Sequence, residues 1–163
     1  MNTLKHSAGF SLIELLIVVA LIGILTAIAA PNMIASRRAA NEGSAISSLR
    51  TIHSAESTYR ATAGDGEFGT LTNLGSEKLI DSLLSSGSKS GYTFACEDAN
   101  LTAGPPPSYF ATAIPSQTGS ASRTGNRSFV ITEDGILRGK ITDVAAENHT
   151  AAADSATWPP LQN

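Results

Sequence analysis

An apolar stretch near the start of this 163-residue chain contains a single ionisable side chain. Residues 9 to 31 read GFSLIELLIVVALIGILTAIAAP, and Glu14 is the one acid or base among them. A carboxylate near the centre of a bilayer costs about 2.5–3.5 kcal/mol, so such a charge is by default functional and has a partner. Glu14 is therefore the first candidate functional residue, and its partner has to be identified.

Other patterns that match chemical motifs lack the context that those motifs need. Residues 64–69 satisfy G-x-G-x-x-G, but a dinucleotide site needs a strand before it and a helix after it, whereas this stretch follows a helical pattern. We expect a turn there. Residues 86–89 match S-x-x-K without the companion motifs of a penicillin-recognising site. The three histidines are scattered (His6, His53 and His149). We expect no enzyme, no catalytic residues, no metal and no cofactor.

The charge and the cysteine content exclude further classes of protein. The net charge is −3, and the basic residues are scattered along the chain except for the adjacent pair Arg37 and Arg38. The sequence therefore lacks the cluster of basic residues that is typical of a nucleic-acid-binding surface. Cys96 is the one cysteine, which excludes an intramolecular disulfide and a multi-cysteine zinc site. It alternates with Phe94 and Tyr92 in a strand-like stretch, so we expect a buried thiol.

The apolar stretch is long enough to cross a membrane. Phe10 to Ala30 would form a helix of about 31 Å, the thickness of a hydrocarbon core. An ordinary secretory signal is the alternative, since Lys5 and His6 resemble a basic leader and Ala27–Ala29 an A-x-A cleavage site. Against that alternative, Glu14 lies at the leading edge of the run, where such signals favour positive charge.

Four residues stand at characteristic spacings around this helix. Gly9 precedes Phe10, Glu14 is the fifth residue after Gly9, and Pro31 is the twenty-second. This arrangement resembles the type IV pilin and pseudopilin family, most clearly over residues 5 to 40. The resemblance implies that a prepilin peptidase cuts between Gly9 and Phe10 and that the new amine of Phe10 is methylated.

The same resemblance implies a partner for Glu14. Cleavage creates an α-amine on Phe10, which is largely cationic at neutral pH because its ordinary pKa is about 7.7–8.0. Family members pair the glutamate with the amine of a neighbouring subunit during assembly. A contact between Phe10 and Glu14 inside one subunit, at helical spacing i and i+4, also stays open.

The periodicity predicts one continuous helix from Phe10 to about Thr62. After Pro31 the pattern becomes amphipathic, and residues 64–66 (Gly-Asp-Gly) end it. Pro31 removes a backbone hydrogen bond and Gly23 lowers helix propensity, so a bend is expected between them. The resemblance implies that the helix loses its regular structure from Gly23 to Pro31 in the assembled filament.

The remaining residues predict a small head. Ser76 is expected to cap a short helix that stops at Gly87. Strands are expected at residues 92–96, 109–114, 128–132 and 136–141, and Asp134-Gly135 indicates a hairpin between the last two. The segment from Ala145 to Trp158 is expected to be mobile.

These elements together predict an α+β fold, a pilin-like lollipop. The C-terminal half of the long helix packs on a small antiparallel sheet of three or four strands. Residues 1–9 form the leader, 10–31 the hydrophobic transmembrane and assembly helix, and 32–163 the periplasmic or extracellular head. Of three N-x-S/T sequons, the one at Asn100 also fits the acidic extended form that bacterial glycosylation enzymes prefer.

The expected function is that of a structural pilin of a type IV pilus. The chain would be a single-pass inner-membrane precursor and then a homo-oligomeric filament at the cell surface, delivered by the inner-membrane assembly machinery. Two alternatives stay open: a type II secretion pseudopilin or minor pilin, and, from another class, a membrane-anchored or secreted monomeric binding domain. The choice among adhesion, motility, DNA uptake and secretion also stays open, as do calcium binding and filament symmetry.

Overall fold

The computed structural model describes residues 9–98, 106–119 and 122–161. By its internal contacts the chain divides into two compact units, one that ends at Ser36 and one that begins at Arg37. We call these the N-terminal unit and the head. Residues 1–8 of the expected leader and the candidate glycosylation residue Asn100 lie outside the described residues.

The predicted long helix is confirmed as α1 (Leu12–Ala61), which contributes to both units. It ends at the Gly-Asp-Gly turn, where Asp65 and Gly66 adopt positive φ angles of 49° and 94°. The Arg60 side chain closes this turn by donating a hydrogen bond to the Gly66 carbonyl, at 2.9 Å. The G-x-G-x-x-G stretch is therefore a turn at a helix end, as expected.

The part of α1 in the N-terminal unit is apolar and exposed on all sides within this chain. Two of its polar side chains bond to its own backbone: Thr26 donates to the carbonyls of Ile22 and Gly23, and Asn32 donates to that of Ile28. Such internal pairing is what a helix in hydrocarbon requires. Among the described residues, α1 is the one helix whose length and composition suit a membrane span.

The part of α1 in the head buries one stripe against the sheet. Its apolar members recur at helical spacing and are Ala45, Leu49, Ile52 and Ala55. The same stripe also contains two buried carboxylates, Glu42 and Glu56, which sequence patterning does not identify as buried.

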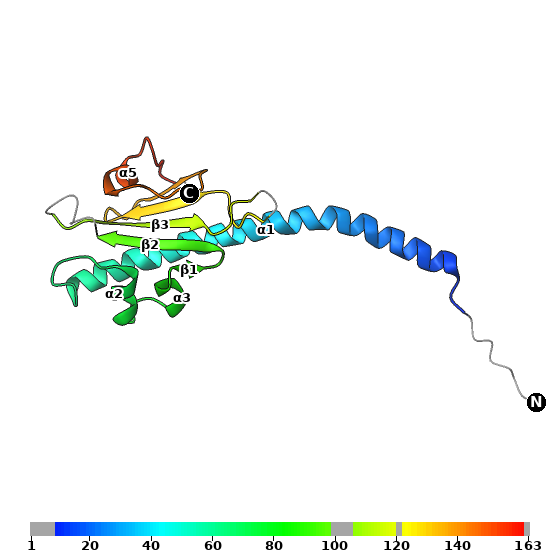
Figure 1. Ribbon diagram of the computed structural model, residues 1–163, viewed down its shortest axis with the longest axis horizontal. Coiled ribbons are helices and arrows are strands. Elements are labelled where there is room, and N and C mark those ends of the chain that lie inside the picture. Colours follow the sequence, from blue (N-terminus) through cyan, green and yellow to red (C-terminus); the bar gives the residue numbers. More distant parts are fainter. Residues whose placement is uncertain (1–8, 99–105, 120–121, 162–163) are drawn as a thin grey trace, which may run out of the picture. The chain divides into compact units, whose positions relative to one another are not determined.

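The head contains a five-stranded antiparallel sheet in the order β1-β2-β3-β4-β5 (Figure 1). The strands are β1 (Ser88–Lys89), β2 (Tyr92–Asp98), β3 (Tyr109–Pro115), β4 (Ser128–Thr132) and β5 (Leu137–Lys140). The expected hairpin at Asp134-Gly135 joins β4 and β5, with Gly135 at a φ of +70°. The α+β class is confirmed, with one more short edge strand than expected.

Both faces of the central strands are covered. Tyr109, Ala111 and Ala113 of β3 lie in the core cluster that includes α1, whereas Phe110 lies in a second cluster on the opposite face. That second cluster joins Phe110 to residues of β4 and of the C-terminal segment: Val130, Ala146, Ala152 and Trp158. The alternation follows from the period of two along a strand.

The C-terminal segment is therefore packed, and the expectation that it is mobile is wrong for its described part. It forms α5 (His149–Ala153), capped by the Asn148 side chain, which accepts from the Ala151 amide. Trp158 is 4% exposed. The buried indole provides a large apolar contact area that holds this segment on the sheet. The rest of the segment is rich in alanine and polar residues, and for that reason its sequence does not predict packing.

The expected helix capped by Ser76 is also wrong. Two shorter helices occupy this region, α2 (Leu71–Ser76), with Thr70 as its N-cap, and α3 (Ser82–Ser85), with Asp81 as its N-cap. Thr70 and Asn73 form a capping box at the start of α2, and Ser76 is the last residue of that helix. Gly87 does lie just beyond the end of α3, at a φ of +79°.

Candidate functional site at the start of the long helix

Glu14 lies in the first turn of α1, and its carboxylate closes that turn. Ser11 precedes the helix, and its backbone N–H donates to Glu14 Oε2 at 2.9 Å. This is the reciprocal half of a capping box, in which an acid at the third helical position accepts from the N-cap amide. A negative charge there is also stabilised by the positive end of the helix dipole. Glu14 therefore has a hydrogen-bond partner within its own chain.

The spacing S-x-x-E could have identified this cap from the sequence alone. The sequence-based expectation names Phe10 as the partner of Glu14 and does not include this cap. In this chain the Phe10 nitrogen belongs to a peptide bond with Gly9, and the Ser11 amide is the donor. The contact between Phe10 and Glu14 within one chain is not formed in this state of the molecule.

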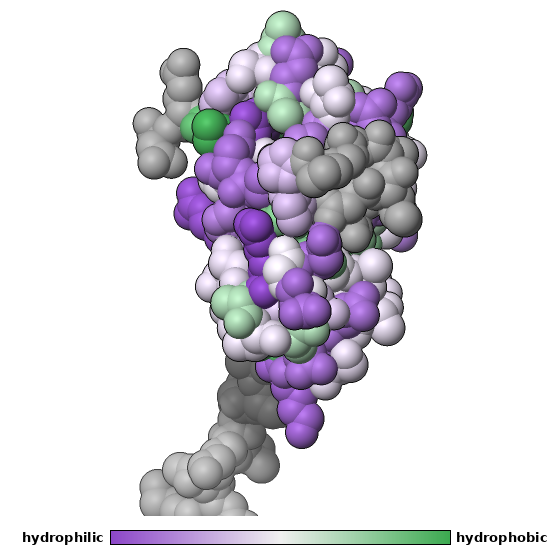
Figure 2. Space-filling view, turned by 90° about the vertical axis from the view of Figure 1, so that its left-hand side faces the viewer, coloured by the Kyte–Doolittle hydropathy of each residue, from purple (hydrophilic) through white to green (hydrophobic). Residues whose placement is uncertain are grey.

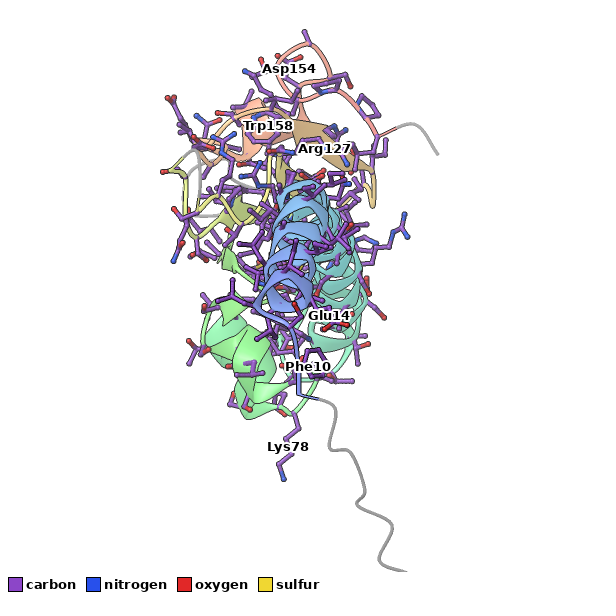
Figure 3. The ribbon with its side chains drawn as sticks, turned by 90° about the vertical axis from the view of Figure 1, so that its right-hand side faces the viewer. Phe10, Glu14, Lys78, Arg127, Asp154 and Trp158 are labelled. Carbon is purple, nitrogen blue, oxygen red and sulfur yellow. The ribbon has the colours of Figure 1, made fainter. Side chains whose placement is uncertain are left out.

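One oxygen of Glu14 stays free. Among the described residues, no hydrogen bond reaches Glu14 Oε1, while Oε2 accepts from Ser11. Phe10 is 79% exposed and lies with Glu14 at the N-terminal end of α1 (Figure 3). The site can thus accept one more donor without losing its helix cap.

The surroundings of Glu14 are apolar and uncovered. Four neighbours on α1 are each more than half exposed: Leu12, Ile13, Leu15 and Leu16. Such a contiguous apolar surface exceeds what monomeric soluble proteins normally expose and marks a surface that contacts lipid or protein. A carboxylate buried there keeps its charge only if a cation is buried with it.

The structure gives no internal reason for glycine at position 9. A Cβ added to Gly9 would meet no described atom within 4 Å, and the same holds for Gly23. The backbone and packing of the chain therefore tolerate a side chain at both positions. A requirement for glycine at position 9 would have to come from another molecule. Pro31 lies within α1, which continues through it.

The other residues considered from the sequence have structural environments inside the head. Cys96 is buried as expected, with its thiol 3.1 Å from Glu56 Oε1. Glu56 is 0% exposed and also accepts from the Gly69 amide at 2.9 Å. His53 Nδ1 lies 2.7 Å from the Tyr109 hydroxyl, whose pKa is raised by burial. Glu56, Cys96 and Tyr109 of this polar cluster are buried, and His53 is half-buried.

No arrangement for metal chemistry is found in the described part of the chain. No group of three or more His, Cys, Asp or Glu side chains there is placed to hold an ion. The face of the head seen in Figure 2 is mainly hydrophilic, with hydrophobic side chains scattered singly. Such a surface is typical of one that faces water.

Comparison with known proteins relates the N-terminal residues to a processing motif. A family model described as the prokaryotic N-terminal methylation motif matches residues 4–30. The chain is 43% identical over 54 residues to the type IV major pilin protein PilA of Myxococcus xanthus, which covers 33% of this chain and 24% of that protein. It is 51% identical over 39 residues to the type IV wide pilus major component PilA4 of Thermus thermophilus, covering 24% and 30%.

A longer and more distant match extends into the head. The chain is 27% identical over 97 residues to the type II secretion system core protein G of Escherichia coli, covering 56% of this chain and 65% of that protein. The matches thus span between about a quarter and just under two thirds of the lengths of these relatives. No solved structure matches the chain.

Proposed function

Because this chain belongs to the type IV pilin and pseudopilin superfamily, we propose that it is a structural subunit of a type IV pilus. It is made as a single-span inner-membrane precursor and is cut by a prepilin peptidase between Gly9 and Phe10. The new α-amine of Phe10 is then methylated. The inner-membrane assembly machinery adds the processed chain to a homo-oligomeric filament that reaches the cell surface.

The observation that carries the proposal is the state of Glu14. Its Oε2 holds the helix start while its Oε1 accepts nothing from the described residues. Cleavage creates the cationic α-amine of Phe10, four residues before Glu14. The Phe10 amine of a neighbouring subunit would then donate a hydrogen bond to Glu14 Oε1. One uncompensated charge in an apolar core costs about 3–5 kcal/mol. The ion pair between Glu14 and the neighbour's Phe10 amine therefore favours the one axial offset between neighbouring subunits that brings these two groups together.

The exposed apolar length of α1 supports assembly by helix packing. Each copy presents the same apolar surface at residues 12–36, and heterologous contacts between copies that do not close generate an open helical polymer. Before assembly the bilayer covers this surface, and afterwards other copies cover it.

Cleavage is tested by the mass of the mature N-terminus. Wild-type protein from cells that contain prepilin peptidase should begin at a methylated Phe10. Gly9→Leu should leave an uncut precursor in the membrane fraction, because the constraint on Gly9 lies in the peptidase and not in this fold. Gly23→Ala is the matched control, since a Cβ there also meets nothing, and it should be cut normally.

The outcome of that measurement separates the proposal from other classes. A mature chain that begins at Ala30 would indicate an ordinary secretory signal, and an intact Met1 would indicate a simple membrane anchor. Either result would contradict the filament proposal and indicate a secreted or membrane-anchored monomeric domain.

A type II secretion pseudopilin is the second candidate, and the length of one match favours it. The similarity to core protein G covers 97 residues and therefore more of the head than the two pilin matches, which cover 54 and 39 residues. Deletion of the gene should abolish sheared surface filaments if the chain is a pilin. If the chain is a pseudopilin, the deletion strain should instead accumulate in its periplasm the proteins that the wild type secretes.

A further inference from the structure

On the part of α1 that lies in the head, the acidic side chains are buried and most of the basic side chains are exposed. Residues 37–61 contain four arginines and two glutamates. Both glutamates, Glu42 and Glu56, are buried. Arg37, Arg50 and Arg60 are exposed. The outward face of this part of α1 therefore carries positive charge without negative charge.

Arg50 stands between two hollows on this face. One has a volume of about 310 Å³ and is walled partly by Ile46, Ile136 and Leu161. The other has a volume of about 390 Å³ and is walled by hydroxyl-bearing residues of α1, including Ser47 and Thr51. Arg50 lines both of them. A side chain from another molecule could therefore approach this guanidinium from either side.

The Arg50 guanidinium is unengaged, unlike those of most arginines in the head. Arg60 donates to the Gly66 carbonyl and lies 5.0 Å above the Phe68 ring. Arg127 pairs with Glu42 at 2.9 Å. Within the described part of the chain, Arg50 makes no hydrogen bond or ion pair. Five donor N–H groups in a shallow hollow are thus available to an acceptor from outside.

The rest of the head has the opposite charge. Residues 62–163 contain eleven acidic and six basic side chains. Four of these carboxylates are exposed and accept no hydrogen bond from a described residue: Asp65, Glu77, Glu97 and Glu147. One chain thus offers both an exposed guanidinium and exposed carboxylates that accept nothing from the described residues, which are the complementary groups that a head-to-tail contact between copies needs.

We propose that Arg50 and its two hollows form a docking surface for a carboxylate on the head of a second copy of this chain. The proposal rests on the filament function proposed above and adds a contact between heads to the packing of apolar helices. Guanidinium groups bind carboxylates in a planar, two-pronged geometry, so Arg50 would fix the orientation of the neighbouring head as well as attract it.

The test replaces Arg50 by a residue that can be cross-linked. In assembled filaments of the full processed chain, Arg50→Lys introduces an amine that a carbodiimide joins to any carboxylate in contact with it. We expect a covalent dimer, and mass spectrometry of mixed isotope-labelled and unlabelled filaments should show that the new amide joins two copies. Arg60→Lys is the matched control, because Arg60 is occupied within its own chain.

Charge reversal gives a second readout. Arg50→Glu should lower the amount of sheared filament by about fivefold or more, because it places like charges in contact. The thermal unfolding of the head should stay unchanged, since the side chain is exposed.

Two outcomes overturn the proposal in different ways. Filaments of Arg50→Glu at wild-type yield, together with no cross-link between copies in Arg50→Lys, would remove the head contact and leave the filament function standing. Failure of the unaltered, processed chain to form filaments would overturn both.

Discussion

At the scale of single residues, Glu14 has two oxygens with different roles. One accepts from the Ser11 amide at 2.9 Å and caps α1, and the other is free among the described residues. The cap gives this carboxylate a hydrogen-bond donor at the start of an apolar helix, where the positive end of the helix dipole also attracts an acidic group. The free oxygen is the part that the proposed assembly uses.

Glu14→Gln separates these two roles. The amide oxygen of glutamine can still accept from the Ser11 N–H, whereas the negative charge is lost. We expect normal cleavage after Gly9 and at least about a tenfold loss of sheared filaments, since a neighbour's buried amine would be left unpaired. If helix capping were the whole role of Glu14, Glu14→Gln would assemble like wild type and Glu14→Ala would not.

A second residue-scale interaction lies in the β4–β5 hairpin. The buried Arg138 guanidinium donates to both carboxylate oxygens of Asp134, which also accepts from the Thr132 hydroxyl and the Ile136 amide. Burial acts to raise the pKa of Asp134, but these hydrogen bonds and the guanidinium charge outweigh it and hold the pKa below its ordinary value.

The direction of that pKa shift predicts how stability depends on pH. A carboxyl group with a depressed folded pKa contributes stability above its unfolded pKa of about 3.9, and this contribution is lost as the pH falls through the lower folded value. Asp134→Asn should destabilise the detergent-solubilised chain by about 1 kcal/mol at pH 7 in urea unfolding, and by less at low pH. Glu147→Gln, at an exposed site, is the control and should unfold like wild type.

At the scale of elements, the C-terminal segment forms a second layer on the sheet. Trp158 and Ala152 of this layer contact the face of β3 and β4 that is opposite to α1. In Figure 3, Asp154 and Trp158 lie together in this layer. The sheet is thus buried on both faces, which explains why nearly all residues of β3 and β4 are buried.

Trp158→Ala tests this layer. Truncation of a buried tryptophan creates a cavity and should lower the free energy of unfolding by about 3–5 kcal/mol. Hydrogen exchange should show that the amides of α5 lose protection while those of α1 keep theirs. Ile141→Ala, at a side chain that is 77% exposed, should change stability by no more than about 0.5 kcal/mol. Unchanged protection in α5 would contradict the packing described here.

At the scale of the whole molecule, the segment from Gly23 to Pro31 is the part of α1 that would link the structure of one chain to the mechanics of the proposed filament. Both residues lie inside the continuous α1, and Pro31 has no N–H to donate to the Ala27 carbonyl. The resemblance to pilins predicts that this segment loses helical structure when assembled, and it would then supply extensible length.

Pro31→Ala should make the filament stiffer. The change restores a backbone hydrogen bond and favours the helix by about 3 kcal/mol, so the segment should resist unwinding. Force–extension curves of single filaments should show a shorter extension before rupture. Met33→Ala, just outside the segment, should extend like wild type. Equal extension of Pro31→Ala and wild type would exclude this segment as the source of elasticity.

Local patterns in the sequence determined much of this protein. The N-terminal methylation motif, the long helix, the main strands and the hairpin at Asp134-Gly135 all depend on residues that are close together in the sequence. Their physical causes are helical or strand periodicity and turn geometry, which a single sequence displays directly. The capping relation of Ser11 and Glu14 was equally local and could have been read in the same way.

The tertiary structure alone decided which polar residues turn inward and what covers the sheet. Glu42 is buried because donors 84 and 85 positions away, the Asn126 amide and the Arg127 side chain, reach its carboxylate. Trp158 packs in the same buried cluster as Phe110, which lies some fifty residues earlier in the chain. A carboxylate on an amphipathic helix faces solvent unless distant donors satisfy it, and no local pattern reveals those donors. The outward charge of α1, and with it the exposed Arg50 surface, follows from that burial.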